Sequence, residues 1–450
     1  MFRHIRLAAL VLCWFVLPNA ALAEEAAADR LRTIASEAYD GNRPGASVIV
    51  YRNGEILLHE AYGLANLELG VAMTTANRFR IASVTKQFTG ATVMRLVEDG
   101  VLDLDANIRT YLPDFADKGD TITLRHLLGH TSGLYNYTNH DDYEAIAHTD
   151  ISLQDTCAYF EDLPLDFPVG SEWSYSNSGY ALTSLIIETV TGREFEDIVA
   201  ERIFASAGMT QSQFQLAGQV MANSPNQYWH GENGFYPAQR AGISGHGDGE
   251  IYSTTGDLLQ WYQALRDDRL FNAETRETFY ASQILPDGRD TRYGLGLFHG
   301  RVGPYATYEH GGNVGGWRAY VIMVPEQDAF VALLANANDT DEGLIASRLM
   351  KAALGLENGA SIEISLEQAA LEGFVGTYRH GPGDVRRIRF EAGRIQSSRG
   401  GGNWHNLVPI GESRFMFQAD PDTQIQFTDT GLNVSYRYGM DHEAVRIEEE

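Results

Sequence analysis

Residues 80–90 have the sequence RIASVTKQFTG, in which Lys86 follows Ser83 by three positions. The chain contains 34 basic residues, but only three of them are lysines: Lys86, Lys118 and Lys351. Arginine keeps its proton at any working pH, whereas a lysine in a dry site can lose its proton. A position that needs a neutral amine cannot be filled by arginine, so Lys86 is the first candidate for such a position.

The same segment is predicted to lead from the strand-like sequence FRIAS into a helix that stops at Gly100. Residues three apart on a helix lie on one face, so the amine of Lys86 would lie one turn from the hydroxyl of Ser83. The helix N-terminus adds positive potential that stabilises an alkoxide and disfavours a charged ammonium. We interpret the pair as a nucleophile and its base. The alternative is a capping serine followed by a solvated lysine.

The composition is that of a globular protein with room for a large domain and a smaller one. The 450 residues are 44% apolar and 21% charged, and the formal net charge is −26. This acidic balance argues against nucleic acid and anionic lipid as partners.

The first 23 residues have the pattern of a cleavable secretory signal. A basic start, MFRHIR, precedes the apolar run LAALVLCWFVL, and small residues flank Leu22. The apolar run is too short to span a bilayer as a helix. We therefore expect residues 1–23 to be removed and the rest to be exported, to a periplasm or to the medium, without stable membrane insertion after cleavage.

The periodicity of the remaining chain predicts an α/β fold of the α+β kind. The expected elements are a helix over 26–39, a hairpin of two strands within 45–62, a mostly helical region over about 80–290, strands at 317–325 and 329–337, and a helix over 341–354. The hairpin would turn at Asn53-Gly54, the dipeptide best suited to a tight turn. The economical arrangement is one antiparallel sheet flanked by helices, with an all-helical lobe beside it.

The C-terminal part of the chain has a different pattern. From about Gly373 to Glu448, eight short candidate strands are separated mostly by Gly or Asp. This pattern predicts a small β-barrel or β-sandwich of its own. We expect residues 24–355 to form the large domain, 356–366 a linker and 367–450 a C-terminal β-barrel domain.

A second candidate for chemistry is the segment FPVGSEWSYSN, which ends in Tyr175, Ser176 and Asn177 and precedes a helical stretch. A phenol on this loop could relay a proton, and an amide could hold a substrate carbonyl. The spacing alone is not specific, because Tyr137 and Asn139 share it. The alternative is a packing tyrosine beside an asparagine turn.

A third candidate is YEHGGNVGGW, in which His310 is followed by Gly311 and Gly312. Two glycines would let a substrate backbone lie close against a strand. The alternative is a glycine-rich turn with an incidental histidine. The segment HGDGE at 246–250 is interpreted as a loop that lines the cleft rather than as a metal site.

These three elements, in this order, resemble the serine β-lactamase and penicillin-binding protein superfamily. The resemblance is closer to its class C-like branch of D-aminopeptidases, D,D-peptidases and esterases. HLLGHTSGL (126–134), GDGEIYSTTGDLLQW (247–261) and YGLGL (293–297) are also similar to that branch. The resemblance covers roughly residues 30–355 and implies a β-lactamase/transpeptidase-like fold that uses no metal and no cofactor. The C-terminal segment that starts FVGTYR resembles the β-barrel appended to many such hydrolases.

The resemblance also implies roles for individual residues. Ser83 would be the nucleophile, and Lys86 with Tyr175 would be the general-base system. Which of the last two accepts the first proton stays open. The substrate-binding residues would be Asn177, His310, Gly311, Gly312 and Asn313. Of these, His310 would lie on the edge strand, and the backbone N–H of Asn313 would form the oxyanion hole with that of Ser83.

One position departs from the family pattern. True β-lactamases generally have a lysine where this chain has His310, and a histidine is largely neutral at pH 7. We therefore expect an exported serine hydrolase that forms an acyl-enzyme on small esters or amides, D-amino-acid peptides included. The alternatives are a β-lactamase or D,D-carboxypeptidase, and a non-catalytic scaffold that binds cell-wall fragments. The expected partner is a small molecule or a short peptide.

Overall fold

The computed structural model describes residues 17–215, 219–240, 242, 246–356, 363–381, 384–399, 404–418, 423–435 and 441–447. Residues 1–16 of the expected signal segment and 357–362 of the expected linker lie outside this set. None of the helices in the described part of the chain has the length and apolar character that a bilayer crossing requires.

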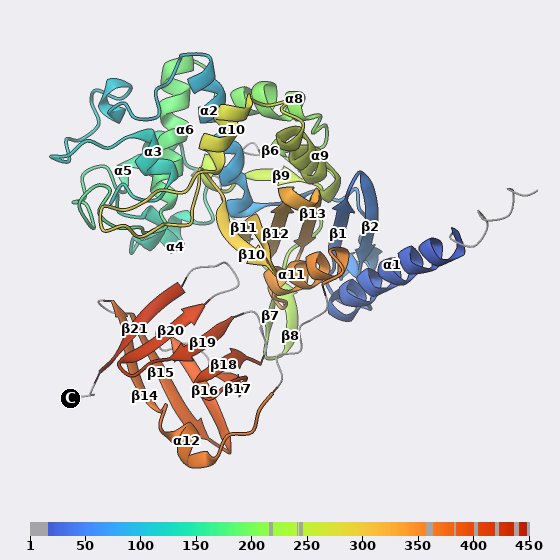
Figure 1. Ribbon diagram of the computed structural model, residues 1–450. Coiled ribbons are helices and arrows are strands. Elements are labelled where there is room, and N and C mark those ends of the chain that lie inside the picture. The colour runs from blue at the N-terminus through green and yellow to red at the C-terminus, as the bar shows by residue number, and fades with distance from the viewer. Residues whose placement is uncertain are drawn as a thin grey trace, which may run out of the picture.

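An antiparallel sheet of six strands forms the centre of the larger part of the molecule (Figure 1). In spatial order the strands are β10 (Phe298–Val302), β11 (Tyr305–Val314), β12 (Trp317–Val324), β13 (Ala329–Ala335), β1 (Ala46–Arg52) and β2 (Glu55–Tyr62). The β1–β2 hairpin turns at Asn53 and Gly54, and both have positive φ, as the type I′ turn requires. The expected hairpin is confirmed.

Two hydrophobic cores lie on the two faces of this sheet. Side chains alternate along β1, so Val48 and Val50 face one core while Ile49 and Tyr51 face the other. The first core is covered by α1 (Leu17–Tyr39) and α11 (Glu342–Ala353), which pack against each other and on the sheet. The second core is shared with α9 (Thr255–Arg266) and with the helical lobe.

The helical lobe lies between β2 and β10 in the sequence and carries short strands of its own. Its helices are α2 (Lys86–Glu98), α3 (Leu124–Leu128), α4 (Tyr143–Ile146), α5 (Leu153–Ala158), α6 (Asn177–Thr191), α7 (Phe195–Val199), α8 (Ala205–Ala207) and α10 (Ala273–Tyr280). Its 3-10 turns are η1 (Ala82–Thr85), η2 (Ile108–Thr110), η3 (Tyr137–Asn139) and η5 (His246–Asp248), and its π-helical turn is η4 (Ala200–Phe204). The short strands are β3 (Leu64–Asn66), β4 (Val71–Ala72), β5 (Phe79–Arg80), β6 (Gln213–Phe214), β7 (Tyr228–Gly231), β8 (Gly234–Pro237) and β9 (Ile251–Ser253).

A closed barrel of eight antiparallel strands forms the C-terminal part, drawn orange to red in Figure 1. Its strands are β14 (Gly376–Gly381), β15 (Asp384–Glu391), β16 (Arg394–Arg399), β17 (His405–Pro409), β18 (Arg414–Phe417), β19 (Gln424–Phe427), β20 (Gly431–Ser435) and β21 (Asp441–Ile447). β14 pairs with β21 and closes the barrel around a core that contains Phe415, Ile425 and Val434. The short helix α12 (Gln368–Glu372) precedes it.

The expected fold class is confirmed, with a barrel rather than a sandwich at the C-terminus. Within the six-stranded sheet, the strands that the periodicity did not predict are β10 and β11. Four glycines, at 300, 303, 311 and 312, interrupt the alternation there. Helix α1 also begins earlier than expected, at Leu17.

Candidate active site

Ser83 lies in η1, a single 3-10 turn between strand β5 and helix α2. The residue before it, Ala82, has a φ of 47°, in the left-handed region that a side chain with a Cβ rarely adopts. Strand β5 is held by antiparallel pairing with β9. The chain therefore turns sharply between two fixed elements, and this turn carries the partly exposed side chain of Ser83.

Lys86 is the first residue of α2 and its side chain is completely buried. Its Nζ lies 3.2 Å from Ser83 Oγ, 2.7 Å from Asn177 Oδ1 and 2.7 Å from the backbone oxygen of Asp248. The two carbonyl oxygens can only accept, so each takes one N–H of the amine. The remaining tetrahedral position of Nζ faces the hydroxyl of Ser83. The alternative of a solvated lysine is wrong.

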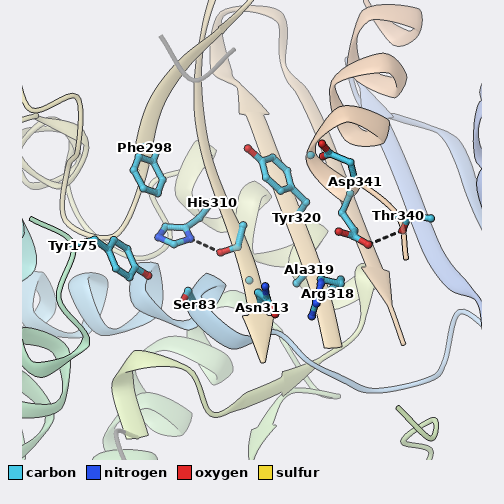
Figure 2. A pocket seen from close by; sticks show the side chains of 14 residues that line it. Ser83, Tyr175, Phe298, His310, Asn313, Arg318, Ala319, Tyr320, Thr340 and Asp341 are labelled. Carbon is cyan, nitrogen blue, oxygen red and sulfur yellow. Dashed lines mark hydrogen bonds between the residues drawn. The ribbon is translucent and has the colours of Figure 1, made fainter. Parts of the chain in front are cut away.

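Tyr175 closes this group from the other side. Lys86 Nζ lies 5.0 Å from the centroid of its ring. The ring packs between His130, at 4.3 Å between centroids, and Phe298, which is nearly parallel to it at 6.4 Å. In Figure 2 the hydroxyl end of Tyr175 is on the side of Ser83, and both residues line the same cavity. The structure thus brings the serine, the lysine and the tyrosine together.

Asn177, at the start of α6, is held by its neighbours as well as by Lys86. Its backbone N–H donates to Asn136 Oδ1 at 3.1 Å, and its Nδ2 donates to Thr138 Oγ1 at 3.3 Å. The amide that sequence analysis assigned to the substrate is therefore also part of the framework that orients the lysine amine.

The HGDGE segment supplies the third partner of the lysine. Asp248 accepts from Lys86 through its backbone oxygen and from the hydroxyl of Tyr137 through Oδ2, at 2.6 Å. Asp248 and Gly249 line a small hollow of about 80 Å³ that also reaches Ser83. The expectation of a loop lining the cleft is confirmed.

His310 lies on β11, which is the second strand of the sheet rather than the outermost one. Strand β10 pairs with β11 only as far as Glu309, opposite Phe298. Beyond that point, within the described residues, the outer side of β11 has no neighbouring strand from His310 to Val314. The expected edge position thus results from the early end of β10.

The ring of His310 is held in one neutral tautomer. Nδ1 donates to the carbonyl oxygen of Gly311 at 2.6 Å, so Nε2 accepts from the hydroxyl of Tyr293 at 3.0 Å. Burial lowers the pKa of His310 to about 3. The ring therefore presents no positive charge to a substrate near neutral pH.

The two glycines after His310 have a packing reason. A Cβ at Gly312 would lie 2.1 Å from the carbonyl oxygen of Ile81, and one at Gly311 would lie 3.1 Å from the ring of Tyr320. Gly312 therefore allows β11 to approach the turn that carries Ser83. The next residue, Asn313, has an exposed side chain and lines both hollows beside Ser83.

A cavity of about 610 Å³ joins these groups to the start of α11 (Figure 2). Ser83, Tyr175 and His310 line one end, and Asp341 and Glu342 line the other. The two ends therefore differ in character: aromatic and neutral groups lie near the serine, and carboxyl groups lie at the far end.

The far end of the cavity contains one carboxyl whose pKa is raised, that of Glu342. Burial raises the pKa of Glu342 to about 7, and Oε1 accepts from the hydroxyl of Thr340 at 2.7 Å. Arg318 also lines the cavity, and one nitrogen of its guanidinium donates to the backbone oxygens of Gly315 and Trp317 at 3.0 and 2.7 Å.

Sequence reasoning assigned no role to several residues of this site: His130, Tyr137, Tyr293 and Asp248. His130 and Tyr293 lie in the segments HLLGHTSGL and YGLGL, which were noted only for their resemblance. His130 is 1% exposed, its Nδ1 accepts from the backbone N–H of Ser176 at 3.1 Å, and burial lowers its pKa well below the usual value. Asp248 acts on the lysine through a backbone oxygen, which no residue pattern reveals.

A serine and a buried lysine beside an antiparallel sheet, with a tyrosine facing both, define the class of beta-lactamase-like hydrolases. The chain belongs to the beta-lactamase family, whose sequence profile matches residues 22–354.

Individual relatives extend this assignment. Penicillin-binding protein 4* of Bacillus subtilis is 26% identical over 458 residues, covering 92% of this chain and 98% of that protein. The D-aminopeptidase of Cereibacter sphaeroides is 31% identical over 329 residues, covering 70% of this chain. The matched region spans 60% of the length of the D-aminopeptidase.

Two solved structures share the fold. The octameric penicillin-binding protein homologue from Pyrococcus abyssi has a TM-score of 0.65 at 21% identity, covering 95% of this chain and all of that one. The D-amino acid amidase from Ochrobactrum anthropi has a TM-score of 0.63 at 22% identity, covering 73% of this chain and 99% of that one.

Proposed function

We propose that this protein is an exported serine hydrolase that forms an acyl-enzyme on Ser83 and hydrolyses small amides or esters. The observation that carries the proposal is the geometry of Lys86 Nζ. Two obligate acceptors take two of its positions, so a neutral amine directs its lone pair at the hydroxyl of Ser83, 3.2 Å away. This is the hydrogen-bonded contact that a general base needs with its nucleophile.

The reaction then has two stages. Ser83 Oγ attacks the substrate carbonyl carbon while Lys86 or Tyr175 takes the hydroxyl proton, and the leaving amine or alcohol receives a proton as the C–N or C–O bond breaks. Water next attacks the acyl carbon and releases the acid and the free serine. The backbone N–H groups of Ser83 and Asn313 are proposed to hold the oxyanion, each contributing about 3–4 kcal/mol.

The charges that line the cavity support neutral or cationic substrates. His310 is neutral, and among the described residues lining the cavity Arg318 is the only permanent cation. Asp341 and Glu342 share the far end with it. A β-lactamase or a D,D-carboxypeptidase must hold a substrate carboxylate, which these charges disfavour. Amides of D-amino acids are the proposed class, in keeping with the relatives named D-aminopeptidase and D-amino acid amidase.

The proposal includes a division of the chain. Residues 1–23 are proposed to be the signal, 24–355 the hydrolase domain, 356–366 the linker and 367–450 the barrel domain. The charge pattern of the N-terminal segment supports export.

The test is labelling with a fluorophosphonate probe, followed by a substrate panel. The wild type is expected to be labelled and Ser83→Ala is not; Ser174→Ala, a change at an exposed serine next to Tyr175, should leave labelling intact. A p-nitrophenyl ester, a D-aminoacyl anilide and a cephalosporin are then compared. Cephalosporin turnover equal to that of the ester would favour a β-lactamase. An unlabelled wild type would favour the non-catalytic scaffold.

A further inference from the structure

The turn that supplies the Asp248 carbonyl is held by charged contacts at both ends. At its start, Nδ1 of His246 contacts Oε1 of Glu196, which lies on α7. At its end, Glu250 lies 3.7 Å from the guanidinium of Arg80, and both side chains are buried. Arg80 Nε also donates to the backbone oxygen of Gly249 at 3.0 Å.

Between these contacts the backbone of the turn is bonded to the elements around Lys86. The N–H of Gly247 donates to Ser184 Oγ at 3.1 Å, and its carbonyl accepts from Thr89 Oγ1 at 2.7 Å. The next carbonyl, that of Asp248, accepts from Lys86. A Cβ at Gly247 would lie 2.3 Å from Ser184 Oγ, so the turn has no room to move toward α6.

Carboxyl groups from α6, α7 and its own segment face His246, while α2, which also packs against this turn, contributes Lys86 at the Asp248 carbonyl. Glu196 comes from α7, Glu188 from α6 and Glu250 from its own segment, and the carboxylates of Glu188, Glu194 and Glu196 lie within 4.8 Å of one another. Burial alone would lower the pKa of His246. The hydrogen bond to Glu196 and the charges of Glu250, Glu196 and Glu188 outweigh burial and raise this pKa to about 9. The imidazolium is thus the counter-charge of this acidic group near neutral pH.

From this geometry we infer that His246 and Glu196 are positioning residues for the reaction, acting through the carbonyl of Asp248. Their ion pair fixes the start of the turn, the turn fixes the carbonyl, and the carbonyl fixes one N–H of the lysine amine. The inference rests on the proposed function of Lys86 as the base for Ser83.

The physical reason is the tetrahedral geometry of the amine. When the Asp248 oxygen moves, the N–H that it accepts follows, and the lone pair of Lys86 rotates away from the hydroxyl of Ser83. A displacement of about 1 Å in such an arrangement lowers the rate by about 100-fold. Substrate contacts in the large cavity are untouched, because His246 and Glu196 do not line it. The loss therefore falls on kcat rather than on KM.

The pair also sets an alkaline limit. The pKa of His246 is raised from 6.5 to about 9 in the folded protein. The stabilisation of the fold by the His246–Glu196 ion pair is therefore fully present below about pH 6.5 and is lost as the pH rises through about 9. A base that only needed to be deprotonated would become more active over this range. We therefore expect turnover to decrease above pH 9.

The experiment uses Glu196→Gln and His246→Asn in the full chain. Asparagine tolerates the positive φ of 45° at position 246, so His246→Asn removes the charge with little backbone strain. The matched control is Glu201→Gln, which removes an exposed carboxylate paired with Arg193. We expect both test variants to lower the fluorophosphonate labelling rate and kcat by about 10- to 100-fold at pH 7.5, with KM within about threefold. In Glu196→Gln the alkaline decline should begin at lower pH than in the wild type, because His246 has lost the carboxylate that raises its pKa, whereas in His246→Asn the decline due to this group should be absent.

A second readout does not depend on activity. Because the chain has three lysines, ¹³C-lysine labelling gives three side-chain NMR signals, and that of Lys86 is identified by its loss in Lys86→Arg. This signal should shift in Glu196→Gln and His246→Asn but not in Glu201→Gln.

An unshifted signal with wild-type kcat in the folded variants would overturn the inference, and so would unfolding of both variants. A shifted signal in a protein whose Ser83 is never labelled would support the His246–Glu196 contact and reject the proposed function.

Discussion

The pattern Tyr-x-Asn occurs three times in this chain, and two of these segments, 137–139 and 175–177, lie beside the same lysine. In the first, Tyr137 is buried and its hydroxyl donates to Asp248 at 2.6 Å. In the second, Tyr175 is partly exposed in the cavity, with its ring 5.0 Å from Lys86 Nζ. The first tyrosine therefore supports the turn that holds the lysine, whereas the second faces the space that a substrate would occupy.

The asparagines of the two segments differ in the same way. Asn177 accepts from Lys86 through Oδ1 at 2.7 Å, while the side chain of Asn139 is exposed. The segments also touch, because Thr138 accepts from the amide of Asn177. Segment 137–139 thus supports the framework around the lysine, whereas segment 175–177 supplies the candidate residues for the reaction. What separates them is burial and the partner of the hydroxyl, not spacing.

The largest expected effect is at Lys86, the lysine that both segments lie beside. Lys86→Arg keeps the charge but cannot supply a neutral amine, and the side chain has no solvent into which to move. We expect kcat/KM to fall by about 10³-fold or more, as far as in Lys86→Ala. Steady-state kinetics on the best ester or anilide measures this. Lys118→Arg, at a lysine bonded to the backbone oxygen of Leu163, is the control and should keep full activity. Near-normal turnover by Lys86→Arg would refute the role of a neutral amine.

The next effect separates the two tyrosines directly. Tyr175→Phe removes the candidate proton relay and should lower kcat by about 10²-fold or more, with little change in stability. Tyr137→Phe removes a buried donor to the carboxylate of Asp248, so it should cost about 1.5–3 kcal/mol of unfolding free energy. Its activity should fall by less than about tenfold, because the Asp248 carbonyl is still held by the rest of its turn.

Urea unfolding and kinetics on the two phenylalanine variants test this division of roles. The contrast fails if Tyr137→Phe loses more turnover than Tyr175→Phe while remaining folded.

The sequence predicts those features that depend on neighbouring residues. The Asn53-Gly54 turn, the alternating strands of the barrel and the three-residue step from Ser83 to Lys86 are all local, and the structure has each of them. The glycine-interrupted strand that carries His310 has weak local preference, and its position depends on pairing with β12. Tyr137 and Asp248 were assigned no role because their contact joins residues 111 positions apart. A contact made by a backbone oxygen, such as that of Asp248, cannot be predicted from the residue type.

The smallest effect compares the two asparagines. Asn177→Ala removes one of the two obligate acceptors of the lysine amine but leaves Asp248 in place, so the amine keeps part of its orientation. We expect kcat to fall by about tenfold, less than for Lys86→Arg or Tyr175→Phe. Asn139→Ala, in the other copy of the pattern, removes an exposed side chain and should leave kcat unchanged. The ¹³C-lysine signal of Lys86 should shift in the first variant and not in the second. Equal kinetics in both would mean that the carbonyl of Asp248 orients the amine by itself, which would make the His246–Glu196 pair more important and Asn177 dispensable.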